Sequence, residues 1–277
     1  MSVALPTSQS GAIAVATACK LLAPGECESK ESGMSLLARA YWLLLNAAQL
    51  VITLLWTVCW IPVALLVRLL TGSTRVPLRM ASWIWAPLLV RGAPARLQLV
   101  GSDAIDWDRP CVLVANHQSM MDIPVLFMAV PTGLRFMLKS ELAKVPFLGW
   151  YTRAMGMVFV DRDRPGSAHG QLAHAAQLVG QGACLVAFPE GTRSRDARVG
   201  QFKTGAFRVA IGAGVDVVPV AIRGSGQVMA PGGFRIRPGQ IRVSFGQPIS
   251  CAGMRTRDAR ELARRARQAI IDMLEAE

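Results

Sequence analysis

The stretch "CVLVANHQSMMDIP", residues 111–124, passes from an apolar run through a polar turn into a helical pattern. Its first five residues have the length and apolar character of a buried strand, and the helical pattern covers residues 119–129. Polar residues directly after a strand are typical of the edge of an α/β sheet at which chemistry takes place. Two questions follow: whether the whole chain alternates in this way, and whether His117 and Asp122 in the turn are functional.

The same alternation continues beyond residue 95. Short apolar runs of strand length, several of them rich in valine, are separated in several places by helical patterns such as 167–180 and about 202–213. This pattern predicts an α/β domain with a largely buried sheet. The predicted strands are 97–101, 111–115, 134–138, 156–160, 184–188, 217–222 and 241–245. The tail from Thr256 onward predicts a basic amphipathic helix with Thr256 as its N-cap.

Composition limits the class of protein. The chain has 277 residues, 52% of them hydrophobic, and its 30 basic residues outnumber 18 acidic ones to give a net charge of +12. A basic and apolar chain suits an anionic membrane surface or an anionic substrate. Nucleic acid is a less favoured partner, because no basic patch is interleaved with stacking aromatics and no zinc-finger motif is present. The length allows one domain with an appendage, or two small domains.

Several patterns that would indicate other chemistry are missing from the sequence. The six cysteines form no CxxC pair, which argues against a disulfide framework and against a zinc site. His169 and His174 share a predicted helix without a third ligand, so we predict no metal site. The sequence has no GxSxG elbow, no GxxxxGKS/T phosphate loop and no GxGxxG after a strand. A serine acyl-enzyme is therefore disfavoured, and no cofactor is predicted.

The chain before residue 95 divides into two sections. Residues 1–33 lack the basic start and long apolar core of a signal peptide, and we predict that they are disordered or a start-site extension. Residues 34–94 are predicted to be membrane-anchoring helices, because residues 40–67 carry no charge. At about 1.5 Å per residue, that run is long enough for the roughly 30 Å core of a bilayer. Pro62 is expected to end or kink the helix.

The flanks of the uncharged run bear on its orientation. The larger positive cluster lies on the C-terminal side and favours a cytoplasmic location for that side. It is formed by Arg68, Arg75 and Arg79. A second apolar stretch, residues 80–90, is too short to span, and its two tryptophans suit an interfacial helix. The alternative is that both stretches are buried helices of a soluble core.

The turn "NHQSMMD" allows two interpretations. Residues five apart on a continuous helix point about 140° away from each other, so His117 and Asp122 converge only if the helix begins after His117. Ser119 is a good N-cap, and Asp122 then occupies the capping-box position. In one interpretation Asp122 only caps the helix. In the other, the same geometry lets Asp122 accept the Nδ1 proton of His117, which leaves Nε2 free to remove a proton from a hydroxyl.

Two more polar clusters follow predicted strands. In "FPEGTRS", residues 188–194, a tight turn would let Glu190 and Arg193 project from one loop. Arg193 has the planar fork that suits a phosphate, whereas Glu190 could bind a hydroxyl or pair with the arginine. In "GMVFVDR", Arg162 ends a strand, and Lys139 follows another. For each cluster the alternative is an ordinary surface turn or a solvated charge.

Taken together, these residues resemble the 1-acyl-sn-glycerol-3-phosphate acyltransferases, which belong to the glycerolipid acyltransferases. "NHQSMMD" is similar to the family's NHx4D signature, "GMVFVDR" to its GxxFxxR block and "FPEGTRS" to its FPEGTRS block. "VVPVAI" resembles the fourth block, and all four occur in the family's order. The resemblance covers about residues 95–250. It implies a mixed sheet flanked by helices, with residues 95–277 as the catalytic domain and a membrane-anchoring helical segment before it.

The resemblance also implies an activity. His117 would act as general base on the free hydroxyl of lysophosphatidic acid, with Asp122 orienting the imidazole. The alkoxide would then attack the thioester of acyl-CoA or acyl carrier protein directly, and phosphatidic acid would form. The residues that the resemblance assigns to substrate binding are Asn116, Lys139, Arg162, Glu190, Gly191, Thr192 and Arg193. The enzyme would face the cytoplasm from a bacterial-type inner membrane.

Three alternatives stay open at this point. The acceptor could be another lyso-lipid, such as a lyso-ornithine lipid, or glycerol phosphate. The chain could be a catalytically silent membrane protein that binds lipid with the same fold. It could also be a metal-dependent hydrolase that uses His117, Asp122 and "DRDR" at 161–164.

Overall fold

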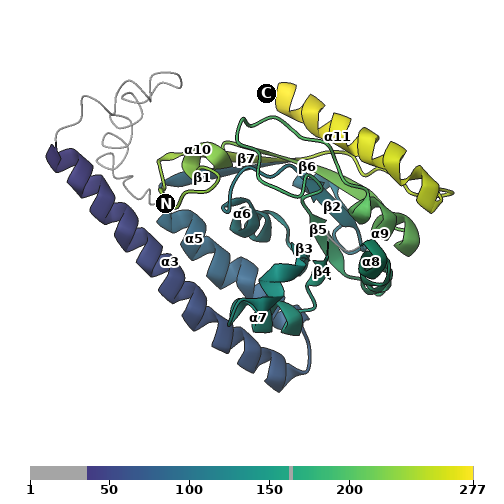
Figure 1. Cartoon of the computed structure of the whole chain (residues 1–277), viewed down its shortest axis with the longest axis horizontal. Helices are drawn as coiled ribbons and strands as arrows, with labels where there is room; N and C mark the ends of the chain where they lie inside the picture. Colours follow the sequence, from purple (N-terminus) through teal and green to yellow (C-terminus); the bar gives the residue numbers. More distant parts are fainter. Residues whose placement is uncertain (1–35, 162–164, 277) are drawn as a thin grey trace, which may run out of the picture. The chain divides into compact units, whose positions relative to one another are not determined.

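A computed structural model describes residues 36–161 and 165–276 of the chain. The helices and strands alternate beyond residue 95 around a seven-stranded sheet (Figure 1). Every predicted strand is present, so the α/β prediction is confirmed. The strands are β1 (Ala95–Val100), β2 (Val112–Ala115), β3 (Leu134–Lys139), β4 (Val158–Val160), β5 (Cys184–Ala187), β6 (Val217–Arg223) and β7 (Gly239–Phe245).

The sheet is mixed, as the resemblance implied. Its strand order is β1-β7-β6-β2-β5-β3-β4. The five strands from β6 to β4 run parallel to one another, whereas β7 pairs antiparallel with β6 and parallel with β1. Because β2, β5, β3 and β4 are neighbours in the parallel part, their carboxyl ends meet at one edge. The three polar clusters of the sequence follow strands of this group, so they all leave the sheet at that edge.

Both faces of the sheet are covered by helices, which explains why the central strands β2 and β5 are apolar and buried at every position. Val112 and Val114 of β2 point into one core cluster, whereas Leu113 and Ala115 point into the other. Helices α8 (Pro165–Gly180), α9 (Gly205–Ala213) and α11 (Ala259–Glu275) cover the first face, and α5 (Ala86–Gly92) and α6 (Asp122–Ala129) the second (Figure 1).

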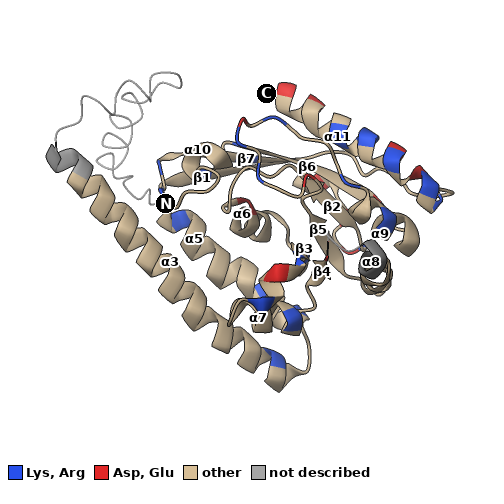
Figure 2. Cartoon of the chain, in the orientation of Figure 1, with Lys and Arg blue, Asp and Glu red and all other residues tan. Residues whose placement is uncertain are grey.

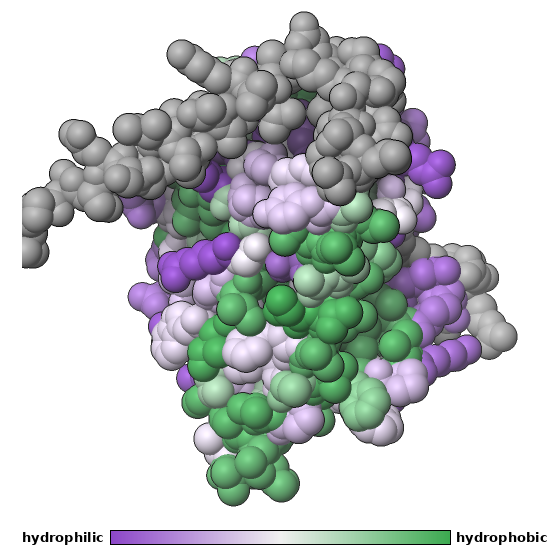
Figure 3. Space-filling model, turned by 90° about the vertical axis from the view of Figure 1, so that its left-hand side faces the viewer, coloured by the Kyte–Doolittle hydropathy of each residue, from purple (hydrophilic) through white to green (hydrophobic). Residues whose placement is uncertain are grey.

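The N-terminal apolar run forms one long helix, α3 (Leu36–Thr71). The helix continues through Pro62, so of the two expected effects of this proline a helix end is wrong, and a kink stays a prediction. Long helices tolerate the loss of one backbone hydrogen bond at proline when other turns hold the segment. Among the described helices, α3 is the one long and apolar enough to cross a membrane, over Ala40–Thr71. Figure 3 shows hydrophobic side chains gathered on the face that carries it.

The chain divides into two compact units at the boundary between residues 48 and 49. Within the second unit, Trp60 and Ala64 of α3 are buried in the same core cluster as strands of the sheet. The C-terminal half of α3 is therefore part of the α/β unit. The prediction that a separate anchoring section ends at residue 94 stays a prediction, and residues 1–33 lie outside the described residues.

The second apolar stretch is helical throughout. It comprises α4 (Arg75–Met80), a π-helical turn (Ala81–Trp85) and α5. Ala81, Ala86 and Val90 are buried against the sheet, whereas Trp83 is 64% exposed. One side of the stretch thus packs in the core while the other carries apolar residues on the surface, which suits the predicted interfacial location.

Some short elements were not predicted. They are α7 (Leu148–Ala154), α10 (Ser225–Val228) and the 3₁₀ turns Ser102–Ala104, Ser140–Lys144 and Thr256–Asp258. The C-terminal helix begins at Ala259 rather than after a Thr256 cap, and Asp258 instead accepts a hydrogen bond from the backbone N–H of Arg255 at 2.8 Å.

Candidate active site

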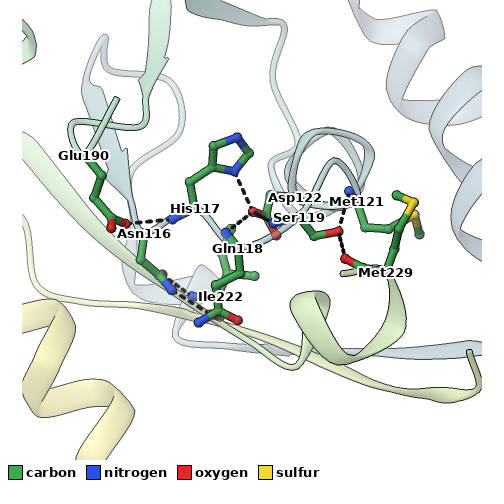
Figure 4. A network of polar contacts seen from close by, with 9 residues as sticks. All are labelled: Asn116, His117, Gln118, Ser119, Met121, Asp122, Glu190, Ile222 and Met229. Atoms are coloured by element: carbon green, nitrogen blue, oxygen red, sulfur yellow. Dashed lines mark hydrogen bonds and ion pairs between the residues drawn. The ribbon is translucent and has the colours of Figure 1, made fainter. Parts of the chain in front are cut away.

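His117 and Asp122 meet at the carboxyl end of β2. The Nδ1 atom of His117 lies 2.7 Å from Oδ2 of Asp122. Helix α6 begins at Asp122, three residues later than the pattern suggested, so His117 lies in the loop before it. Asp122 is fully buried, and the His117 side chain is 14% exposed. Figure 4 shows the second ring nitrogen, Nε2, on the side of the ring away from Asp122.

The same carboxylate oxygen also holds the loop. Oδ2 of Asp122 accepts the backbone N–H groups of Gln118 at 2.8 Å and Ser119 at 2.9 Å (Figure 4). The Ser119 hydroxyl accepts the N–H of Met121 and donates to the carbonyl of Met229 at 2.7 Å. The two interpretations of the turn are therefore compatible, because Asp122 serves as acceptor for the loop and for the imidazole at once.

The FPEGTRS loop fixes His117 from the other side. Oε1 of Glu190 accepts the backbone N–H of His117 at 3.0 Å, and the carbonyl of His117 accepts the N–H of Ser194 at 2.8 Å. The ring of Phe188 stacks on the imidazole with 4.0 Å between centroids and 14° between planes. The imidazole is thus held by a carboxylate at its edge, an aromatic ring on its face and two backbone hydrogen bonds.

Glu190 links the loop of His117 to the segment at Gly200. Its second oxygen accepts the N–H of Gly200 at 2.9 Å, and the residue is buried. The pKa of Glu190 is raised by burial, an effect that outweighs the two backbone hydrogen bonds. An ion pair with Arg193, one of the two roles considered for Glu190, is not among the contacts of the described residues. Both oxygens of Glu190 instead bind the protein backbone.

Replacing Glu190 with glutamine is expected to destabilise the fold at neutral pH by about 1–3 kcal/mol, because one of the two N–H donors would face an amide NH2. The raised pKa adds a pH dependence. The stability that protonation of Glu190 contributes is fully present below the ordinary glutamic acid pKa, and it is lost as pH rises through the folded-state pKa. Glutamine does not titrate. The difference in free energy of unfolding between wild type and Glu190→Gln should therefore narrow as pH rises from the ordinary glutamic acid pKa through the raised pKa of the folded state.

Thermal unfolding in detergent over a pH series measures this gap. Glu275→Gln, a substitution at an exposed glutamate at the end of α11, is the control and should leave the unfolding temperature unchanged. A gap that widened with rising pH would contradict the dominant effect of burial on Glu190.

Asn116 is placed differently from the expectation that it binds substrate. Its side-chain amide donates to the carbonyl of Ile222 at 2.8 Å, and its carbonyl oxygen accepts the N–H of the same residue at 2.7 Å. The side chain is buried and extends the pairing of β2 with β6 by one step (Figure 4). Both polar atoms are thus engaged by the backbone, and Asn116 fixes the point at which the His117 loop leaves the sheet.

The basic residues of the predicted site lie in exposed or half-exposed positions. Arg193 is half-exposed and has no hydrogen-bond or ion-pair partner within the described residues. Thr192 is exposed, and Gly191 adopts a φ of 80°, which explains the glycine in the turn. Lys139 ends β3 and pairs with Glu141 at 2.7 Å. Arg162 lies outside the described residues.

A cavity of about 560 Å³ lies beside the loop that carries His117. It is lined by Gln118, the segment 194–197, Arg223, Gly224, Gly226, Gln227, Pro231 and Leu274. His117 is not among the lining residues, so the cavity adjoins the loop on the Gln118 side rather than the imidazole itself.

Some supporting contacts had no signal in the sequence. Phe188 was part of the quoted motif, but nothing in the motif shows that its ring stacks on His117. The bonds from Asn116 to Ile222 join residues 106 positions apart, and the bond between His117 and Glu190 spans 73. Only the order of the parallel strands brings these residues together.

Comparison with known proteins places the chain in a family. Residues 96–223 match the model of the family described as Acyltransferase. A chloroplastic 1-acyl-sn-glycerol-3-phosphate acyltransferase of Brassica napus is 41% identical over 51% of this chain and 41% of its own length. The 1-acyl-sn-glycerol-3-phosphate acyltransferase of Pseudomonas aeruginosa is 34% identical over 66% of this chain and 70% of its own length.

A solved structure is also similar. The crystal structure of the 1-acyl-sn-glycerophosphate (LPA) acyltransferase from Thermotoga maritima superposes with a TM-score of 0.73 at 27% identity, over 86% of this chain and 98% of that one. The matched part of the chain spans only about two fifths of the chloroplastic relatives from Brassica napus and Arabidopsis thaliana. It spans more than two thirds of the Pseudomonas protein, however, at 34% identity. The chain therefore belongs to the 1-acyl-sn-glycerol-3-phosphate acyltransferase family.

Proposed function

We propose that the protein transfers a fatty acyl group from a thioester donor to the free sn-2 hydroxyl of 1-acyl-sn-glycerol-3-phosphate, giving phosphatidic acid. The observation that carries this proposal is the bond of 2.7 Å between the buried Asp122 and Nδ1 of His117, with Nε2 on the other side of the ring. The relatives from Brassica napus and Pseudomonas aeruginosa are named for this activity, which supports the choice of acceptor.

The proposed reaction needs one base and no covalent acyl-enzyme. Nε2 of His117 removes the hydroxyl proton as the acceptor oxygen attacks the thioester carbonyl. The C–S bond then breaks, and the imidazolium returns the proton to the leaving sulfur, so that a free thiol is released. Asp122 stabilises the imidazolium through the Nδ1–H bond and keeps Nε2 unprotonated before the reaction.

The backbone amides of the loop beside His117 are not free to stabilise the tetrahedral oxyanion of the proposed reaction. The backbone N–H groups of His117, Gln118 and Ser119 already donate to the carboxylates of Glu190 and Asp122. An amide that is bound to a carboxylate is a poor donor for a second anion. The oxyanion donors of the proposed reaction therefore belong to other groups at this edge of the sheet.

The acceptor phosphate is proposed to bind the basic residues at the same edge. Arg193 is the first candidate, because it leaves the loop that fixes His117 and has no partner within the described residues. Lys139 ends β3, and Arg162 comes after β4 in the sequence; these two strands adjoin in the sheet. Gly191 and Thr192 shape the turn that carries Arg193, whereas Asn116 and Glu190 are proposed to position the loops instead of touching substrate.

The proposed setting is an anionic membrane. Residues 34–94 would anchor the chain, residues 95–277 would form the catalytic domain, and the net charge of +12 would favour the cytoplasmic leaflet of a bacterial-type inner membrane. The donor would be acyl-CoA or acyl carrier protein. Both carry phosphates, and both suit a basic enzyme.

The test of the function is an assay on membranes that contain the wild-type chain. Lysophosphatidic acid is supplied with acyl-CoA or with acyl carrier protein, and thiol release and phosphatidic acid are followed together. Equal amounts of both products are expected with at least one donor, in the presence of a chelator as well as without it. The absence of phosphatidic acid with both donors would remove lysophosphatidic acid as the acceptor and direct the assay to other lyso-lipids.

Arg193→Ala should reduce kcat/KM for lysophosphatidic acid by roughly 10- to 100-fold, the equivalent of one charge-assisted hydrogen bond to phosphate. The loss should fall mainly on KM, because the phosphate is remote from the reacting carbonyl. Arg198→Ala is the matched control, since Arg198 lies on the same loop with an 89% exposed side chain. Equal effects of the two substitutions would show that Arg193 acts only through net charge.

A further inference from the structure

The segment that follows β3 carries an exposed aromatic surface. Val145, Phe147 and Trp150 form what we call the aromatic tip, with exposed fractions of 42%, 45% and 56%. The rings of Phe147 and Trp150 contact each other with 5.1 Å between centroids. Exposed apolar residues that stand alone are ordinary, but adjacent aromatic rings on one short turn mark a contact surface.

The backbone that carries the tip is closely packed. Gly149 is buried, and a Cβ there would lie 2.2 Å from the carbonyl oxygen of Ala143, so the 3₁₀ turn and α7 approach each other as closely as backbones can. Phe147 adopts a φ of 60°, a conformation that non-glycine residues rarely take. A strained backbone that holds a phenyl ring toward solvent points to a function for the ring rather than to folding.

The charges and the location of the tip indicate its partner. Lys144 and Arg153 flank the tip and are exposed, and Figure 2 shows basic positions on the segment around α7. Tyr151, on the same helix, packs into the core cluster that contains Trp60 and Ala64 of α3. The tip thus belongs to the same compact unit as the apolar surface of α3 from residue 49 onward.

We propose that the aromatic tip inserts into the boundary between headgroups and acyl chains of an anionic bilayer, with Lys144 and Arg153 against lipid phosphates. Aromatic rings beside basic side chains suit this boundary, because the rings occupy the apolar side and the cations the anionic one. The tip also shares a compact unit with the apolar surface of α3. A bilayer accounts for both apolar surfaces, whereas a protein partner or a second copy of this chain would account only for the tip.

Insertion of the tip would hold the sheet edge that carries His117 close to the bilayer surface. The tip follows β3, whose carboxyl end lies at the same sheet edge as the loop of His117. A bilayer held at the tip would therefore lie near the edge at which a lipid acceptor must arrive. The insertion itself does not depend on acyl transfer, so it can be tested whether or not the proposed activity is found.

The experiment uses tryptophan quenching in the full chain. Wild type, Trp150→Phe and Trp107→Phe are reconstituted in vesicles of phosphatidylcholine and phosphatidylglycerol, with acyl chains either brominated near the headgroup or unbrominated. Phenylalanine preserves the apolar contact and removes only the reporter. Trp107 is the control because its ring packs on Phe245 and its N–H donates to the carbonyl of Ser102, away from the tip.

The expected result is that Trp150→Phe loses a quenched component of the emission, whereas Trp107→Phe keeps the full bromine-quenched signal of the wild type. Phe147→Gly provides a second reading, since glycine adopts a φ of 60° without strain and the fold is retained. In that variant Trp150 should be quenched less than in wild type, because one of the two aromatic rings of the tip is gone.

Two outcomes would overturn the proposal. Quenching that is the same in Trp150→Phe and in wild type would place Trp150 outside the bilayer. A dimer in detergent that dissociates in the Phe147→Gly variant, together with unquenched Trp150, would make the tip an interface between copies of the chain. Neither outcome bears on the acyl-transfer assay, which tests the proposed function separately.

Discussion

His117→Ala is expected to reduce turnover by roughly 10²- to 10⁴-fold while the binding of lysophosphatidic acid changes little, because a positioned general base contributes about that factor. In the proposed mechanism, Nε2 of the histidine takes the proton from the acceptor hydroxyl. Its other nitrogen, its ring face and its two backbone groups are all engaged by the protein, at 2.7–4.0 Å. A side chain fixed at Nδ1, on one ring face and through its backbone is preorganised to act through Nε2.

The measurement compares wild type, His117→Ala and His174→Ala at equal protein levels in the membrane. His174 is exposed on α8 and serves as the matched control, so its variant should retain full activity. Thermal unfolding of His117→Ala should remain close to wild type, since the backbone bonds to Glu190 and Ser194 do not involve the ring. A fully active His117→Ala variant would show that the histidine has no catalytic role, and the proposed mechanism would be wrong.

The seven strands could be predicted because each contains a short apolar run, and the central strands β2, β5 and β6 are buried at nearly every position. Once β2, β3, β4 and β5 are parallel neighbours, their polar successors must lie at one edge. The sequence therefore predicted that His117, Asp122 and Glu190 lie at one edge, but not how they bind one another. Asn116 illustrates the difference. The sequence alone does not distinguish an asparagine that binds a substrate from one that binds the backbone of Ile222, as Asn116 does.

The elements that were missed have a common physical reason. Helices α7 and α10 are 7 and 4 residues long, which is too short for a helical period to emerge from the sequence. Their positions are fixed by tertiary packing, as the close approach of Gly149 to Ala143 shows for α7. The proline of α3 does not end the helix, since the surrounding turns continue through Pro62.

Asp122→Asn is expected to reduce turnover by roughly 10²-fold with little loss of stability, since a charge-assisted hydrogen bond worth about 1.5–3 kcal/mol becomes a neutral one. Three donors converge on one oxygen: the N–H groups of Gln118 and Ser119, and Nδ1 of His117. The asparagine carbonyl is expected to take that place. Its NH2 would replace Oδ1, which is buried and has no hydrogen-bond partner within the described residues.

Asp122→Ala separates the two tasks of this carboxylate. It leaves all three donors without an acceptor, and each buried donor without a partner costs about 1–3 kcal/mol, so several kcal/mol of stability should be lost. The imidazole also loses its orienting bond, so turnover should fall roughly 10²- to 10⁴-fold. Thermal unfolding and turnover are measured for both variants. If Asp122→Asn lost as much stability as Asp122→Ala, the amide would have turned its NH2 toward the loop, and the charge of Asp122 would be required to build the site as well as to support the imidazolium.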